Sequence, residues 1–324
     1  MSIVTSSQIR SNAMNCSLCL LASMAAFTFG CSNDFAPYSQ LDSLRVLAVQ
    51  SEPPNPLPAE PALMSALTFA PAGQAVSHQW SWCPVAARAS DSYNCPLDES
   101  AAAQFLGAPV PPFDLGTAPT ANLTNPFPVA TLTALCGEGV NTGGYSAGID
   151  CADGFPITVV LDVRAGAASL RAGFVVRLPA SSPPILNRNP NFDGLTLGGT
   201  ELVPGGPVTL AATPGKPLDL VARLAADAAE LRSIPATEGD PGQRLERLAL
   251  SWFADAGKFD KDRTVFIDGV APLDQAAVNP WTAPKEEAWP TGPVTFHVVV
   301  RDDRGGVGWV SRQVQLQVQA QVHP

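Results

Sequence analysis

The sequence predicts an all-β protein with two sandwich domains, and three observations support this prediction. The chain of 324 residues contains 32 prolines and 26 glycines, which disfavour long helices and suit short strands joined by tight turns. Apolar and polar residues alternate over many short segments, such as LRVLAV at residues 44–49 and GFVVRL at 173–178. A strand with tryptophan, followed later by a long hairpin, occurs in each half of the chain.

The alternating pattern predicts strands in both halves, interrupted by one insertion at residues 84–128. Within the insertion, Asp98 is placed to cap a short helix that starts at Glu99, and a proline-rich loop follows. The expected strands cover residues 43–49, 62–69, 77–83, 130–136, 157–164, 170–178, 195–197, 208–212, 218–224, 245–253, 294–301 and 309–318.

The two halves of the chain have a similar order of features. Trp80 and Trp82 precede the hairpin ITVVLDVRAGAASLRAGFVVRL, and Trp252 precedes the hairpin VTFHVVVRDDRGGVGWVSRQVQL. Two units of short strands with a buried tryptophan indicate two immunoglobulin-like β-sandwich domains. The segment VVVRDDRGGVGW also resembles the closing hairpin of PKD-type bacterial domains of this class.

These features predict a division of the chain into five parts. Residues 1–30 are expected to be a lipoprotein signal peptide and residues 31–42 a polar tether. The first sandwich, with its cysteine-containing insertion, is expected over residues 43–179 and the second over residues 191–324. Residues 180–190 are rich in proline and are expected to form an extended linker.

The start of the chain has the composition of an export signal. Arg10 is the only charged residue before the uncharged run CSLCLLASMAAFTFG, which is too short to span a bilayer core of about 30 Å. The run ends in Gly30 and Cys31, which resemble the lipobox of bacterial lipoproteins, although Thr28 and Phe29 depart from its usual Leu and small residue. The resemblance implies that Cys31 is lipidated and anchors the protein to a membrane, with the outer membrane as the expected location.

Four cysteines remain after the signal and the proposed lipid site are set aside. An even number of cysteines in an exported chain predicts two disulfides, for which three pairings are open. The short polar loops between them favour Cys83–Cys95 and Cys136–Cys151. A zinc site is disfavoured because these cysteines have no CxxC spacing and no nearby histidine.

The charge of the chain disfavours nucleic acid as a partner. The formal net charge is −10 at pH 7, and no cluster of Lys and Arg offsets it. An acidic surface repels phosphate backbones. We therefore expect a protein or glycan partner.

One enzyme motif occurs, and its setting does not suit catalysis. Gly144 to Gly148 reads G-x-S-x-G, the nucleophile motif of α/β-hydrolases, with Ser146 as its serine. That motif works where a strand turns sharply into a helix, and the flanking glycine-rich residues predict neither. A triad would also need a histidine, but His297 lies inside an expected strand. We expect no catalytic residues.

Acidic residues in two loops of the second half suggest a weaker hypothesis, a Ca²⁺ site. The two loops are expected to approach each other at one end of the second sandwich, and Ca²⁺ prefers oxygen ligands on flexible loops. Lysines and arginines lie next to these acids in the sequence, so solvated ion pairs account for them equally well. We therefore expect no cofactor and keep Ca²⁺ as the weaker alternative. The candidate ligands are Asp255, Asp260, Asp262, Asp302 and Asp303.

Trp281 and Trp289 flank the loop segment NPWTAPKEEAWP, and are the candidates for ligand contact. Exposed aromatic side chains in loops can stack on sugars or anchor a protein partner. The alternative is that both rings fill the end of the sandwich core.

A wider resemblance covers most of the chain. The tether after Cys31, the segment LDSLRVLAVQSEPP, the W-x-W-C strand and the motif NRNP are together similar to uncharacterised lipoproteins of myxobacteria and their relatives. The resemblance implies an envelope location and no known reaction.

The sequence therefore favours a non-enzymatic envelope lipoprotein with a binding or structural role. The second hypothesis is a carbohydrate-binding or adhesive module, with Ca²⁺ in the acidic loops. The third is a secreted serine hydrolase built on Ser146.

Overall fold

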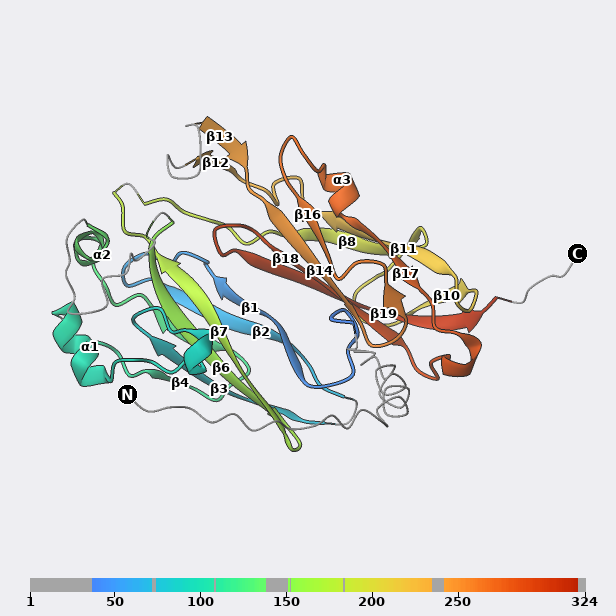
Figure 1. Ribbon diagram of the computed structural model, residues 1–324, viewed down its shortest axis with the longest axis horizontal. Helices are drawn as coiled ribbons and strands as arrows, with labels where there is room; N and C mark the ends of the chain where they lie inside the picture. Colours follow the sequence, from blue (N-terminus) through green and yellow to red (C-terminus); the bar gives the residue numbers. More distant parts are fainter. Residues whose placement is uncertain are drawn as a thin grey trace, which may run out of the picture. The chain divides into compact units, whose positions relative to one another are not determined.

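The computed structural model describes residues 37–71, 74–107, 109–137, 151, 153–182, 184–234 and 242–319. Pro37–Pro324 forms one compact unit, and β-strands dominate its regular structure (Figure 1). Within the described residues, four sheets of three to five strands face each other in pairs, which we call the first and second sandwich in chain order. The all-β prediction is confirmed.

In the first sandwich, a sheet of order β1-β2-β5 faces a sheet of order β4-β3-β6-β7. Side chains from both sheets form a single buried cluster. Trp80 and Trp82 are buried on the same side of β3, as the alternation predicted, and their ring N–H groups donate to the carbonyl oxygens of Ala118 and Pro112 at 3.0 and 2.9 Å. The strands are β1 (Arg45–Glu52), β2 (Pro61–Phe69), β3 (Val76–Cys83), β4 (Asp114–Gly116), β5 (Ala121–Thr124), β6 (Phe155–Ala165) and β7 (Ala168–Leu178).

In the second sandwich, a sheet of order β15-β17-β11-β8-β9 faces a sheet of order β10-β19-β18-β14-β16. Trp252 of β14 is buried between them, and its ring N–H donates to Thr264 Oγ1 at 3.0 Å. The strands are β8 (Phe192–Leu197), β9 (Thr200–Glu201), β10 (Val208–Ala212), β11 (Pro217–Leu224), β14 (Leu248–Ala254), β15 (Lys258–Phe259), β16 (Arg263–Phe266), β17 (Val278–Thr282), β18 (Val294–Arg301) and β19 (Val307–Val318).

The strand order of both sandwiches is that of an immunoglobulin-like fold. In the first, β1, β2 and β5 face β3, β4, β6 and β7; in the second, β8, β11 and β17 face β14, β16, β18 and β19. Both also carry a buried tryptophan on the strand that opens the second of these sheets, a hallmark of the class. The division into two domains stays a prediction, since Pro37–Pro324 is one unit by its contacts.

One expected strand, residues 130–136, is wrong because the segment forms the helix α2 (Val129–Cys136). Leu132, Leu135 and Cys136 all contact the core cluster of the first sandwich. Their spacing of three and four residues is that of one helix face, which the short apolar run concealed.

The predicted helix cap in the insertion is confirmed. Asp98 precedes α1 (Glu99–Leu106), and its Oδ1 accepts a hydrogen bond from the Ala101 N–H at 2.7 Å. The other short elements are 3₁₀ turns at Ala89–Asp91 and Glu286–Ala288, the helix α3 (Leu273–Ala276) and the hairpin of β12 (Leu231–Ile234) and β13 (Gly242–Leu245).

The end of the expected tether, residues 37–42, is bound to the second sandwich. The Leu41 N–H donates to the carbonyl oxygen of Ala254 at 2.9 Å, and the Ala254 N–H donates to that of Ser39 at 3.0 Å. The Ser39 N–H also donates to Asp262 Oδ1 at 3.1 Å. These residues are therefore part of the fold before the chain enters β1.

A third buried cluster joins the two sandwiches, and we call this contact the seam. It packs the start of the first sandwich against the outer face of the β14–β18–β19 sheet. Its buried members are Leu41, Leu47, Ala48, Phe253, Val299 and Val307.

The expected linker lies against the seam as well. The Asn189 side chain is 7% exposed, and its Nδ2 donates to the Ser51 carbonyl oxygen at 2.8 Å and to Glu52 Oε2 at 2.7 Å. Its Oδ1 accepts a hydrogen bond from the Val307 N–H at 2.8 Å. One amide therefore connects the end of β1, the linker and the start of β19.

We expect Gly308→Ala to destabilise the protein, because a Cβ at this position would overlap the carbonyl oxygen of Pro190. The clash with backbone atoms should lower the free energy of unfolding by about 1–3 kcal/mol. Urea unfolding measures this loss. Gly206→Ala is the matched control because nothing lies within 4 Å of the place that its Cβ would take. Equal stability of both variants would contradict close packing at the seam.

Candidate ligand-binding recess

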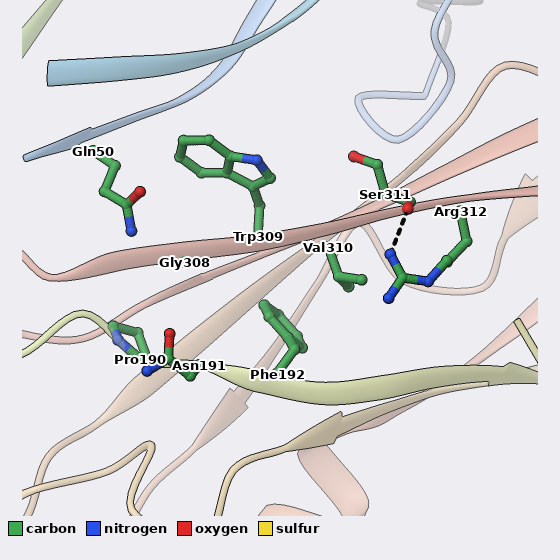
Figure 2. A pocket seen from close by; sticks show the side chains of 9 residues that line it. All are labelled: Gln50, Pro190, Asn191, Phe192, Gly308, Trp309, Val310, Ser311 and Arg312. Carbon is green, nitrogen blue, oxygen red and sulfur yellow. Dashed lines mark hydrogen bonds between the residues drawn. The ribbon is translucent and has the colours of Figure 1, made fainter. Parts of the chain in front are cut away.

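A recess of about 490 Å³ lies beside β19, next to the seam. Figure 2 shows the amide of Gln50 and the indole of Trp309 on one side of β19, with Phe192 and Val310 on the other. The recess therefore follows the edge of the strand. The residues that line it are Gln50, Pro190, Asn191, Phe192, Gly308, Trp309, Val310, Ser311 and Arg312.

The hairpin that precedes β19 brings these residues together. Asp302 Oδ1 accepts hydrogen bonds from the main-chain N–H groups of Arg304 and Gly306 at 2.8 and 2.7 Å, which shape the turn. Asp302 Oδ2 accepts a hydrogen bond from Asn187 Nδ2 of the linker at 3.0 Å. The turn thus holds the linker beside Gly308, where the missing side chain permits close approach.

Polar groups of β1 and β19 face the recess. Gln50 Nε2 donates to the Val307 carbonyl oxygen at 2.6 Å, which fixes the amide at one end. The Arg312 guanidinium donates to the carbonyl oxygens of Leu202 and Ser311, both at 2.8 Å. An amide, an indole and a guanidinium are suited to hydrogen bonding and stacking with a ligand.

A histidine and a serine lie in contact beside the recess. His297 Nδ1 and Ser311 Oγ are 2.7 Å apart. His297 is buried, and this burial lowers its pKa from 6.5 to about 4. The imidazole is therefore uncharged at neutral pH, and its contact with the serine joins β18 to β19.

The predicted disulfides are both present. Cys83 and Cys95 are joined with a Cα–Cα distance of 5.4 Å, and Cys136 and Cys151 with 5.8 Å. The second bond fixes the end of α2 near the start of β6. Cys31 and Ser146, the predicted lipid site and hydrolase serine, lie outside the described residues.

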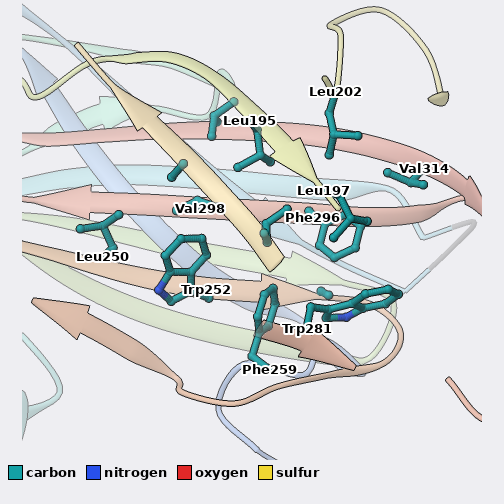
Figure 3. Packing of buried hydrophobic residues seen from close by; sticks show 14 of the residues in the cluster. Leu195, Leu197, Leu202, Leu250, Trp252, Phe259, Trp281, Phe296, Val298 and Val314 are labelled. Carbon is teal, nitrogen blue, oxygen red and sulfur yellow. The ribbon is translucent and has the colours of Figure 1, made fainter. Parts of the chain in front are cut away.

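The expectation of ligand contact at Trp281 needs correction. Trp281 lies in β17 and is fully buried, with its ring against Phe296 and Phe259 nearby (Figure 3). Its ring N–H donates to the Ala256 carbonyl oxygen at 3.0 Å, so the indole is a core residue. Trp289 is half-buried against the same core, and its contact with a ligand stays a prediction.

The two acidic loops do not meet, which corrects the geometry expected for a Ca²⁺ site. β14 and β18 are antiparallel, so Asp255 follows β14 beside Thr295 at the start of β18. Asp302 follows the other end of β18. The strand of Val294–Arg301 separates them by about 20 Å or more.

Four of the five candidate acidic side chains have hydrogen-bond or ion-pair partners within the protein. Asp255 Oδ1 accepts from the Thr295 N–H at 2.9 Å, and Asp303 Oδ2 accepts from Arg244 Nη2 at 3.1 Å. Asp260 is exposed. No group of three His, Cys, Asp or Glu residues that could hold a metal occurs among the described residues.

The sequence analysis missed the residues that form the recess. Gln50 lies in β1, Asn191 follows the linker, and Trp309 and Arg312 lie in the last strand. Each fits an ordinary strand or loop pattern, and only the seam brings them together. The run GGVGW was the available signal, because glycines before a tryptophan permit close approach of another backbone.

The fold places this chain in the class of immunoglobulin-like β-sandwich proteins. No family model matches the sequence, and no curated protein matches it. No helix among the described residues is long and apolar enough to cross a membrane.

Solved structures that match include three proteins with low identity. Murine CEACAM1b is 7% identical, with coverage of 83% of this chain and 99% of that chain and a TM-score of 0.21. The three N-terminal domains of the bacteriophage RB49 outer capsid protein Hoc are 10% identical, with coverage of 85% of this chain and 59% of that chain and a TM-score of 0.19. The Yersinia pseudotuberculosis adhesin InvE is 10% identical, with coverage of 82% of this chain and 58% of that chain and a TM-score of 0.19. This chain thus spans less than two thirds of the latter two. TM-scores this low carry no argument, and the fold class rests on the strand order above.

We expect acid to destabilise the fold partly through His297. Its folded pKa lies below the unfolded value, so its stabilising contribution is complete above pH 6.5 and is lost as the pH falls toward about 4. The loss amounts to at most about 3 kcal/mol. Unfolding free energies measured across this range should fall less steeply in His297→Gln than in the wild type.

The matched control is His78→Gln, since His78 is less buried. Burial raises the pKa of Glu246, Asp255 and Asp302, which favours the folded state at low pH and opposes the histidine. All variants keep these carboxyls, so the difference between wild type and His297→Gln gives the contribution of His297 to the pH dependence of stability. Identical slopes for wild type and His297→Gln would contradict the burial of a neutral histidine.

Proposed function

We propose that this chain is a non-enzymatic lipoprotein of the bacterial envelope, attached to the outer membrane through Cys31, that binds a partner at the recess beside β19. The anchor rests on the export signal and the Gly30–Cys31 junction. The binding role rests on the recess itself. Most large apolar side chains of the two sandwiches are buried in their cores, which suits a rigid protein with a binding or structural role.

The observation that carries the proposal is the set of groups at the recess. Trp309 is half-buried, so part of its indole is open to solvent next to the Gln50 amide and the exposed Asn191. Aromatic and arginine side chains with a polar rim are enriched where proteins bind partners. The two sandwiches hold these groups in place through the Asn189 hydrogen bonds, so little order is lost on binding.

The proposed anchor would hold the fold close to the membrane. Only residues 32–36 separate Cys31 from the bound segment that starts at Pro37. Even a fully extended chain of this length spans about 20 Å. A partner would therefore be another envelope component, or a molecule that reaches the membrane surface.

The test is photo-crosslinking in cells, with a photoreactive amino acid at Asn191 on the rim of the recess. We expect crosslinked species of higher mass in the membrane fraction, because a bound partner lies against this residue. In a Cys31→Ala background, the protein that is not crosslinked should leave the membrane fraction.

The matched control has the photoreactive residue at Val270, which is 77% exposed and does not line the recess. Equal crosslinking at Val270 and Asn191, or none at either, would contradict binding at the recess. Unchanged membrane attachment of Cys31→Ala would contradict the lipid anchor.

A further inference from the structure

The edge of β19 is only partly covered by a neighbouring strand. On one side, β19 pairs with β18 from Val307 to Val314. On the other side, β10 pairs with β19 only from Val314 to Val318. Residues 308–313 therefore have a strand partner on one side, and their other side faces the recess.

The register shows which main-chain groups point to this open side. The Val307 N–H donates to Asn189 Oδ1, and the Val307 carbonyl oxygen accepts from Gln50 Nε2, so both groups of Val307 point away from β18. In an antiparallel pair the direction alternates along the strand. Trp309 and Ser311 therefore also turn their main-chain groups away from β18.

Most of these outward groups have no partner in the fold. The Ser311 carbonyl oxygen accepts from the Arg312 guanidinium, drawn as the dashed line in Figure 2. Among the described residues, no hydrogen bond outside the strand ladder involves the N–H or carbonyl of Trp309 or the N–H of Ser311. Two N–H donors and one carbonyl acceptor along this edge are thus unpaired, as is usual at the edge of a sheet.

The open edge continues beyond the first recess. A second recess of about 280 Å³ shares Ser311 and Arg312 and is bounded by residues 203–206. The two recesses lie along the same strand, between the linker and the start of β10. An extended chain could follow the edge through both.

The side chains along the edge indicate what such a chain would carry. The half-buried Trp309 lies on one side of the strand and the half-buried Phe192 on the other, so each face of an added strand would have an apolar side chain to contact. Arg312 has no carboxylate within 4.0 Å among the described residues. Its guanidinium would pair with an acidic side chain of the ligand.

We propose that the open edge of β19 binds an extended peptide segment of a partner protein by strand addition, with an acidic residue of the peptide at Arg312. The main-chain groups of Trp309 and Ser311 would supply the hydrogen bonds and the flanking side chains the selectivity. The Gln50 and Asn189 amides occupy the edge at Val307, so the added strand starts after this residue. This inference rests on the proposed binding role of the recess.

The test uses the full-length protein in mild detergent, panned against a displayed library of random short peptides. We expect enriched peptides to be rich in β-branched or aromatic residues and to contain Asp or Glu. Ser311→Pro removes the outward N–H and leaves the β18 ladder intact, as proline does at an edge. It should weaken the binding of the enriched peptides by about tenfold or more relative to Ser311→Ala, which lacks the same hydroxyl but keeps the N–H.

Thermal unfolding of Ser311→Pro checks that the variant is folded. If it is not, Arg312→Gln provides the second test, since it should remove the preference for acidic peptides with the fold unchanged. Failure to enrich peptides, or equal binding by Ser311→Pro and Ser311→Ala, would overturn strand addition. Crosslinking at Asn191 that persists in that case would leave the recess as a site for another ligand, such as a glycan.

Discussion

The Asn189 side chain is the contact on which the rest of the arrangement depends. Its amide joins the end of β1, the linker and the first residue of β19, and it is almost fully buried. A buried amide without its partners would be costly, so these three segments are fixed together. The recess exists because the linker is held beside Gly308 while β10 starts only at the level of Val314.

A buried ion cluster supports the same corner from the second sandwich. The Arg304 guanidinium donates to Glu246 and Glu230, and also to the Leu186 carbonyl oxygen of the linker at 2.8 Å. Glu246 is fully buried, so the ion pair must offset a large desolvation cost and adds little net stability. Its hydrogen bonds hold the hairpin turn against the linker.

The sequence predicted those parts of the fold that depend on local pattern. The alternation around Trp80 and Trp82 and the glycine turns of the two long hairpins predicted strands that the structure confirms. The even cysteine count and short loops predicted both disulfides. The prediction of a strand at α2 is wrong because a short apolar run fits a strand and a helix equally well.

The candidate site could not be predicted in the same way, because it depends on contacts between distant residues. Trp281 resembles an exposed loop residue in sequence, yet the pairing of β17 with β11 places it in the core, while Trp309 is left at an open edge. Residue-resolved amide hydrogen exchange along β19 tests this claim most directly. The account predicts that the amides of Trp309 and Ser311 exchange much faster than those of Gly308, Val310 and Arg312. Equal protection of all five would show that the edge is already covered and would contradict the account.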